Sequence, residues 1–165
     1  MAISRQDRRF LLQCNEVRQE SHDPDRKVGV IIADVDGQIL ARGTNAPPRS
    51  LGLTAAESHE AIRQDPRWKY FVLEHAERNA IFDALLRGKS LTGSTMYGTL
   101  FPCADCARAI VASGVSRLVV FGLGSHPERD EKWLEHYRHA ERIFALAGVR
   151  VETVDPNELA PPDRR

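Results

Sequence analysis

The sequence predicts an α/β fold with three layers, in which helices cover both faces of a five-stranded mixed sheet. The chain has 165 residues, of which 42% are hydrophobic, and this is enough for one domain with a substantial core. Segments with helical and strand periodicity alternate along most of its length. A helix separates each of the last three predicted strands from the next, so the right-handed crossover rule makes strands three, four and five parallel.

The first helix is predicted over residues 5–19. Within this segment the apolar residues Phe10, Leu11, Cys14 and Val17 recur at helical spacing and form one stripe on an otherwise charged surface. Cys14 belongs to this stripe, so we expect a small buried hydrophobe at this position and not a ligand or a nucleophile.

A β-hairpin is predicted next. Residues 28–33 are apolar and largely β-branched, residues 34–37 carry an Asp-Gly turn signal, and residues 38–42 return as the second strand. Residues 43–54 are rich in Gly, Pro and polar side chains and are expected to form a loop. A short helix over residues 54–64 follows that loop and ends at an Asp-Pro pair.

The second half of the chain alternates helix and strand. The helix predicted over residues 74–88 carries the small side chains Ala76, Ala80 and Ala84 on one stripe, which permits close packing on a sheet, and Gly88 suits its C-terminal cap. The later elements are a strand over residues 94–100, a helix over residues 103–113, a strand over residues 117–121, a helix that Asp130 caps and that ends at Gly148, and a strand over residues 149–154.

These elements make residues 1–155 a single predicted domain, followed by a polar tail over residues 156–165. Lys plus Arg and Asp plus Glu both number 23, so no overall charge excess attracts nucleic acid or an anionic membrane. No stretch approaches the roughly 20 apolar residues of a membrane span, and the first ten residues lack the apolar run of a signal peptide, so we expect a cytoplasmic protein. Three cysteines are too few for a disulfide scaffold.

Two short motifs carry the residues that suggest chemistry. Residues 75–77 are His-Ala-Glu at the start of one predicted helix, and residues 102–106 are Pro-Cys-Ala-Asp-Cys at the start of the next. Helix starts that follow a strand or loop lie where open α/β sheets place their active sites, and the potential there favours thiolates. The C-x-x-C spacing alone fits a redox disulfide, a structural metal site or a catalytic metal site.

The two motifs together favour a catalytic metal site. One imidazole, from His75, and two thiolates, from Cys103 and Cys106, make three ligands and leave the fourth tetrahedral position of a zinc ion for water. Glu77 stands two residues from His75, within reach of that water, whose pKa zinc lowers to about 7. It is therefore positioned to move protons. A redox pair would leave His75 and Glu77 without a role.

The pattern H-x-E followed by P-C-x-x-C is typical of zinc-dependent nucleobase deaminases. HAERNAI and FPCADCARAIVASGV resemble the cytidine and deoxycytidylate deaminase superfamily, and the match is closest to the dCMP deaminases, whose pattern is HAE-x-NAI and then FPC-x-x-CA. The resemblance covers most of the chain, including DPDRKVGVII and the GTN that follows the hairpin. A parallel fifth strand resembles the dCMP and tRNA-adenosine deaminase branch.

The resemblance implies a cytidine deaminase-like fold, a zinc cofactor, hydrolytic deamination of a cytosine-type nucleotide or nucleoside with release of ammonia, and a homo-oligomer. The alternatives are a deaminase of tRNA adenosine or of a free nucleobase, and, outside enzymes, a zinc-stabilised binding module. Nucleic acid and membranes are not expected as partners. The implied site residues are zinc ligands His75, Cys103 and Cys106, acid/base residue Glu77, and substrate contacts Asn45, Ala76 and Arg26, the last as a candidate for a phosphate.

The chain departs from the dCMP deaminase pattern in three places, which weaken that specific substrate and leave deamination intact. Residues 44–47 are Thr-Asn-Ala-Pro where Tyr-Asn-Gly is usual, which bears on the allosteric nucleotide site and the fit of the sugar and phosphate. Residues 46–74 contain no cysteine for the second zinc of many bacterial members. Glu74 is an added acid that would repel a phosphate if it faced the pocket.

The other aromatic and titratable candidates have structural explanations. Trp68, Tyr70 and Phe71 are expected to pack in the core, with contact to a substrate base as the alternative. The remaining histidines are expected to be solvated and not to form a second metal site; they are His22, His59, His126, His136 and His139.

Overall fold

The computed structural model describes residues 3–122 and 127–159, with only the backbone at residues 127–129. A five-stranded sheet in the order β2-β1-β3-β4-β5 forms its centre. Strand β1 pairs antiparallel with β2 and with β3, whereas β3, β4 and β5 are parallel to one another. The strands are β1 (Gly29–Ala33), β2 (Ile39–Thr44), β3 (Thr95–Gly98), β4 (Arg117–Phe121) and β5 (Arg150–Val154). The predicted mixed sheet with three parallel strands is confirmed.

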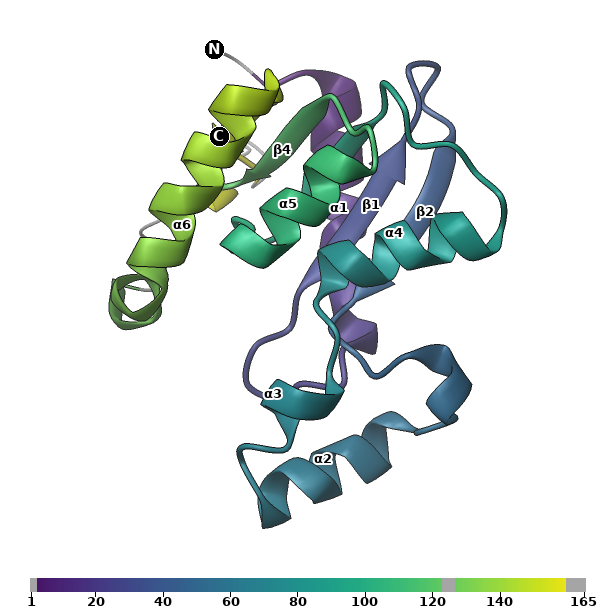
Figure 1. Cartoon of the computed structure of the whole chain (residues 1–165), viewed down its shortest axis with the longest axis vertical. Helices are drawn as coiled ribbons and strands as arrows, with labels where there is room; N and C mark the ends of the chain where they lie inside the picture. The colour runs from purple at the N-terminus through teal and green to yellow at the C-terminus, as the bar shows by residue number, and fades with distance from the viewer. Residues whose placement is uncertain (1–2, 123–126, 160–165) are drawn as a thin grey trace, which may run out of the picture.

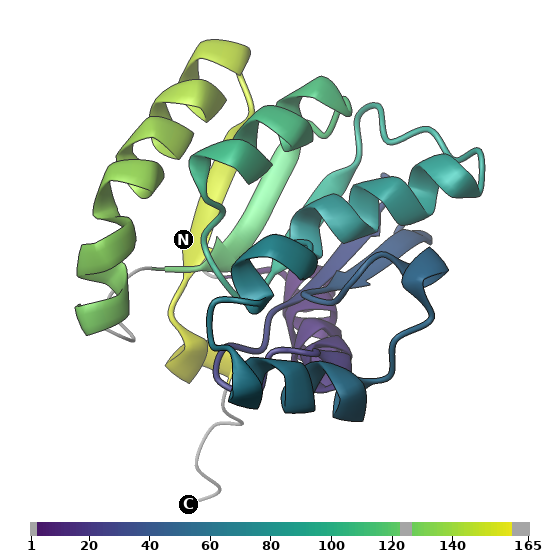
Figure 2. The same cartoon turned by 60° about the horizontal axis from the view of Figure 1, so that its bottom comes forward.

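Helices cover both faces of this sheet. Helices α4, α5 and α6 lie side by side on one face and α1 lies on the other, while α2 and α3 lie at one end (Figures 1 and 2). The α-helices are α1 (Arg5–Val17), α2 (Ala55–Gln64), α3 (Lys69–Val72), α4 (Ala76–Leu86), α5 (Ala104–Ala112) and α6 (Pro127–Ala147). Short 3-10 helices are η1 (Arg18–Glu20), η2 (Arg49–Leu51) and η3 (Pro156–Leu159).

The strands alternate their side chains between two cores, as the period of two in a strand requires. Val30 and Ile32 of β1 pack with α4, α5 and α6, whereas Ile31 packs on the other side with α1. Cys14 of α1 is fully buried in that second core, and burial raises the pKa of its thiol to about 12. The prediction that Cys14 is a core residue is confirmed.

Four local predictions differ from the structure. The long helix begins at Pro127 and not at Asp130, because proline suits the first turn of a helix. Tyr70 and Phe71, predicted to pack in the core, are 61% and 76% exposed on the short helix α3, which the sequence analysis missed. His22 is half-buried and its Nδ1 lies 2.7 Å from the Ser58 hydroxyl.

The other histidines that were predicted to be solvated differ in their exposure. His59 and His136 are half-buried, and the His136 ring lies 5.0 Å from that of Trp133, whereas His139 is exposed. His126 lies outside the described residues.

The first part of the predicted polar tail is packed against the domain. Residues 156–159 form η3, and Leu159 is 6% exposed in the core beside α1. The Arg8 guanidinium donates to the carbonyl oxygens of Glu158 and Leu159 at 2.8 and 2.7 Å. No helix in the described part of the chain is long and apolar enough to cross a membrane.

A buried ionic network joins α1 to the sheet. Arg117 of β4 donates to both carboxylate oxygens of Asp7, at 2.7 and 2.9 Å, and the Tyr97 hydroxyl donates to the same carboxylate at 2.9 Å. Burial alone would raise the pKa of Asp7, but hydrogen bonds from Arg117, Ser4 and Tyr97 outweigh it and lower the pKa from 3.8 to about 2. The ionised carboxylate is therefore the form that stabilises the fold.

Replacing Asp7 by Asn is expected to lower the free energy of unfolding at pH 7 by about 2–4 kcal/mol, because Arg117 is left without its main partner. Since the pKa of Asp7 is depressed by folding, its contribution is complete above about pH 4 and disappears as the pH falls toward 2. Urea unfolding from pH 7 to pH 2 should therefore show the two proteins converging in acid. A constant difference over this range, or no difference at pH 7, contradicts the prediction; the exposed Glu16→Gln variant is the control.

Gly43 lets β2 and α4 approach closely. A Cβ atom at this position would lie 2.2 Å from the Ala76 carbonyl oxygen and 2.5 Å from the Ala80 nitrogen, and backbone atoms cannot yield as a flexible side chain can. Gly43→Ala is therefore expected to destabilise the protein by about 1–3 kcal/mol in chemical denaturation. The matched variant Gly122→Ala, whose Cβ would make ordinary contacts at 3.7 Å, should behave like the unaltered protein. Equal stability of both variants would refute the packing argument.

Candidate active site

The three predicted metal ligands come from the first turns of two neighbouring helices. His75 is the residue that caps the start of α4, Cys103 caps the start of α5, and Cys106 lies in the first turn of α5. The loop that carries Cys103 follows β3, so the site lies at the carboxyl end of the parallel strands, where open α/β sheets bind ligands.

The geometry of these three side chains fits a metal ion. The Nδ1 atom of His75 lies 3.6 Å from the Cys103 sulfur and 3.4 Å from the Cys106 sulfur, and all three atoms lie within 4.8 Å of one another. In a tetrahedral zinc site with Zn–S of about 2.3 Å and Zn–N of about 2.0–2.1 Å, nitrogen and sulfur ligands are about 3.5 Å apart. Among the described residues this is the one such group of possible ligands. The donor set of one imidazole and two thiols therefore fits zinc.

Glu77 completes the cluster without belonging to the ligand set. Its carboxylate oxygen Oε2 lies 3.5 Å from the Cys106 sulfur, and the residue is only 5% exposed. Burial raises the pKa of Glu77, and the nearby His75 only partly opposes this. A carboxylate beside a metal site can act as a proton acceptor and donor.

The two thiols differ in their acidity. The hydrogen bond from Cys106 lowers the pKa of the Cys103 thiol to about 4, despite its burial, and the hydrogen bond with Cys103 raises the pKa of His75. The pKa of Cys106 shifts upward because its thiol donates to Cys103 and is buried. A bound cation removes this asymmetry, since a coordinating thiol is deprotonated.

Two asparagines hold the loops around the site. The Asn45 amide oxygen accepts from the Ser21 hydroxyl at 2.7 Å and from the Val28 nitrogen at 2.9 Å, and its Nδ2 donates to the Arg26 carbonyl at 2.6 Å. Asn79, in the HAERNAI motif, donates to the carbonyl oxygens of Thr44 and Ala46 at 2.9 and 3.0 Å. The Asn45 side chain therefore joins its own loop to the segment that contains Ser21, Arg26 and Val28. Its contact with substrate stays a prediction. The sequence analysis did not assign a role to Asn79.

The added acid Glu74 is neutralised within its own helix turn. Its Oε1 accepts from the His75 backbone nitrogen at 2.8 Å and from Arg78 Nε at 2.7 Å, and it forms an ion pair with the same guanidinium. The charge that would repel a phosphate is therefore paired with Arg78. The carboxylate instead helps to fix the backbone at the ligand His75.

The remaining predicted substrate contacts lie on either side of the metal ligands. Ala76 is 1% exposed at the start of α4. The Arg26 guanidinium lies 5.5 Å from the centre of the Trp133 ring, and the edge-on His75 ring is 6.5 Å from the same ring. Trp133 therefore separates Arg26 from a metal ligand. Trp133 was not among the predicted site residues; it lies near the start of α6.

Comparison with known proteins identifies the family. The family model described as the cytidine and deoxycytidylate deaminase zinc-binding region matches residues 4–122. The chain belongs to the cytidine and deoxycytidylate deaminase family. This membership confirms the predicted family, zinc as the cofactor, and hydrolytic deamination as the reaction class.

Individual members of this deaminase family support the assignment. An uncharacterized deaminase from the luxG 3' region of Aliivibrio fischeri is 31% identical over 153 residues, which cover 90% of this chain and 93% of that one. Human deoxycytidylate deaminase is 30% identical over 131 residues, covering 79% of this chain and 69% of the human protein. The dCMP deaminase of cyanophage S-TIM5 in its apo form has a TM-score of 0.67 at 22% identity, covers 92% of this chain, and is itself fully covered.

Proposed function

We propose that this deaminase hydrolyses the amino group of a cytosine nucleotide and that Glu77 moves the protons. The position of the Glu77 carboxylate carries the proposal, because its Oε2 lies 3.5 Å from the Cys106 sulfur and the residue is only 5% exposed. A carboxylate in this place reaches the reacting atoms without being one of the metal ligands.

Zinc held by His75, Cys103 and Cys106 would supply Lewis-acid activation of a water molecule at neutral pH. Glu77 accepts a proton from the attacking water at Oε2 and donates it to the ring nitrogen N3 while the water oxygen bonds to C4. A second proton passes through the same carboxylate to the 4-amino group, the C4–N4 bond breaks, and ammonia leaves a uracil ring. Glu77 is suited to this cycle because it is buried beside the metal ligands and is not one of them.

A phosphorylated substrate is supported by two observations. Relatives that match most of this chain are named deoxycytidylate deaminase, the human one among them. A cleft of about 910 Å³ that contains Arg26 also lies beside Trp133, which contacts the His75 ring. In this proposal Arg26 contacts the phosphate, and Asn45 and Ala76 contact the nucleoside. A homo-oligomeric, cytoplasmic enzyme is part of the same proposal, and light scattering after gel filtration gives its subunit number.

Ammonia release from a substrate panel tests the function. The panel contains cytosine, deoxycytidine, dCMP, guanine and an adenosine-containing tRNA stem-loop, each measured before and after chelation. We expect release from the cytosine nucleotide and none after chelation. Release only from the tRNA or the free bases would reassign the substrate, and no release from the zinc-loaded protein with any compound would indicate a zinc-stabilised binding module.

A further inference from the structure

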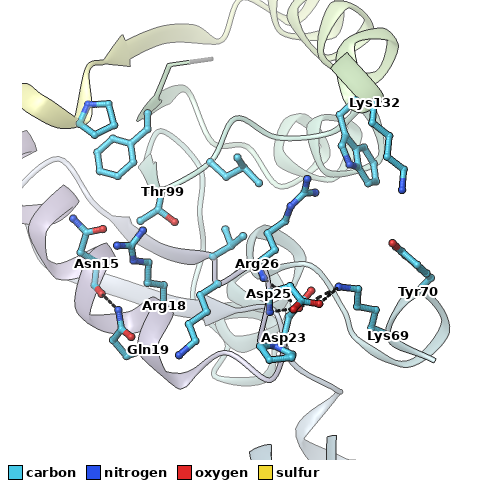
Figure 3. Close-up of a pocket in the computed structure, with 17 residues that line it drawn as sticks. Asn15, Arg18, Gln19, Asp23, Asp25, Arg26, Lys69, Tyr70, Thr99 and Lys132 are labelled. Carbon is cyan, nitrogen blue, oxygen red and sulfur yellow. Dashed lines mark hydrogen bonds and ion pairs between the residues drawn. The ribbon is translucent and has the colours of Figure 1, made fainter. Parts of the chain in front are cut away.

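We propose that the cleft beside Trp133 contains a second anion subsite, formed by Arg18 and Lys27, which adapts this deaminase to nucleotides with more than one phosphate. The inference rests on the proposed deaminase function and extends it to the length of the phosphate chain. Figure 3 shows the cleft, with Arg18 beside Asn15 and Gln19 at one end, Tyr70 and Lys132 at the other, and Arg26 between them.

The cleft carries an excess of positive charge. Three more cations than carboxylates line it: the cations are Arg18, Arg26, Lys27, Lys69 and Lys132, and the carboxylates are Asp23 and Asp25. Such a concentration of one sign of charge in a concave surface attracts anions. The neutral overall charge of the chain conceals this local excess.

The two carboxylates of the cleft, Asp23 and Asp25, already pair with Lys69. Lys69 donates to Asp23 at 3.3 Å and to Asp25 at 3.0 Å, and Asp23 also accepts from the backbone nitrogens of Asp25 and Arg26 at 2.9 and 3.2 Å. In the part of the chain that the structure describes, no carboxylate pairs with Arg18 or Lys27. These two side chains therefore present donors and charge to whatever enters the cleft.

The position of Arg26 orders the subsites. Its guanidinium packs over Trp133, whose ring also lies against His75, so Trp133 connects this cation to a metal ligand. A base held beside Glu77 would place its first phosphate near Arg26. Further phosphates would then extend toward Arg18, at the end of the cleft away from Tyr70 and Lys132 (Figure 3), and toward Lys27, which also lines the cleft.

The size and boundaries of the cleft agree with this order. Its volume of about 910 Å³ is near the upper end of the range of about 300–1,000 Å³ for small-molecule sites, which leaves space beyond one nucleoside monophosphate. Phe121 at the end of β4 and Pro156 at the start of η3 also line it. The volume therefore suits a nucleotide with a short phosphate chain.

Calorimetric titration of the zinc-loaded protein with inorganic phosphate and with tripolyphosphate tests the second subsite without requiring turnover. We expect tripolyphosphate to bind at least about tenfold more tightly than phosphate. The double variant Arg18→Gln/Lys27→Gln should lose about tenfold in affinity for tripolyphosphate and less than about twofold for phosphate. The matched control, Arg5→Gln/Lys89→Gln, replaces exposed cations outside the cleft and should change neither; zinc content is measured after each titration.

Kinetics then connect the subsite to the reaction. The ratio of kcat/KM for dCTP to that for dCMP should fall about tenfold in the double variant, while deoxycytidine is turned over as before. Equal affinity for both inorganic anions, an unaffected double variant, or tighter binding of an oligodeoxycytidylate than of dCTP would each overturn the inference. Ammonia release from no compound, with tripolyphosphate binding retained and sensitive to Arg18 and Lys27, would refute the proposed function and leave the anion subsite standing.

Discussion

A protein with Gln in place of Glu77 should bind zinc normally and yet release ammonia about 10²–10⁴-fold more slowly than the unaltered deaminase. Glutamine has almost the same shape and fills the same space, but it cannot take a proton from water and pass it to the base. The substitution thus removes the proton carrier and keeps the packing of a residue that is 5% exposed. The rate of ammonia release and the zinc content, measured on the same preparation, decide the result.

The exposed Glu141→Gln variant is the control for the loss of one carboxylate elsewhere on the protein. It should retain full activity. If Glu77→Gln kept more than half of the original kcat at equal zinc content, the proton transfers could not pass through this side chain, and the proposed mechanism would have to be abandoned.

Removal of a metal ligand should affect activity and stability together. Cys106→Ser is expected to lose its bound zinc and all measurable deaminase activity, because a serine hydroxyl is not a zinc ligand of comparable strength. The melting temperature should fall by more than about 10 °C, since metal binding and folding are coupled when the ligands come from different elements. Chelation of the unaltered protein should cause a similar fall, and chelation of the variant no further one.

Cys14 offers the matched control for this experiment. It is a fully buried residue of α1, in a different core from the metal-ligating cysteines, so Cys14→Ala should lower stability and keep zinc and activity. A Cys106→Ser protein that binds zinc as the unaltered protein does would show that this thiol is not a ligand.

The fold was predictable because its main elements carry regular patterns. Apolar, β-branched runs in the strands, the alanine stripe of α4 and the order of helices and strands together imply the parallel arrangement of β3, β4 and β5 that the structure has. Short elements without periodicity were not predictable. Helix α3 has only four residues, and its aromatic side chains Tyr70 and Phe71 gave a misleading signal for burial.

The residues of the metal centre were predictable from the sequence, whereas the cleft was not. His75, Glu77, Cys103 and Cys106 lie in two compact motifs whose spacing matches the chemistry they perform. The cleft instead joins the continuous segment 23–28 to residues from distant segments, among them Arg18, Lys69 and Lys132, and no repeated spacing in the sequence links those segments. Neither the pairing of Glu74 with Arg78 nor the contact of Trp133 with His75 has a sequence signal as strong as a repeated spacing.

The metal ligands and the cleft cations belong to different segments of the chain. The ligands open α4 and α5, which pack rigidly on the sheet, whereas Arg18, Lys27, Lys69 and Lys132 come from η1, the loop before β1, α3 and α6. Under the proposed anion subsite, substitutions in these segments would alter which anion is accepted, provided that Trp133 of α6, which packs beside His75, is kept. Substrate selectivity in this deaminase could therefore be changed without replacing a metal ligand or Glu77.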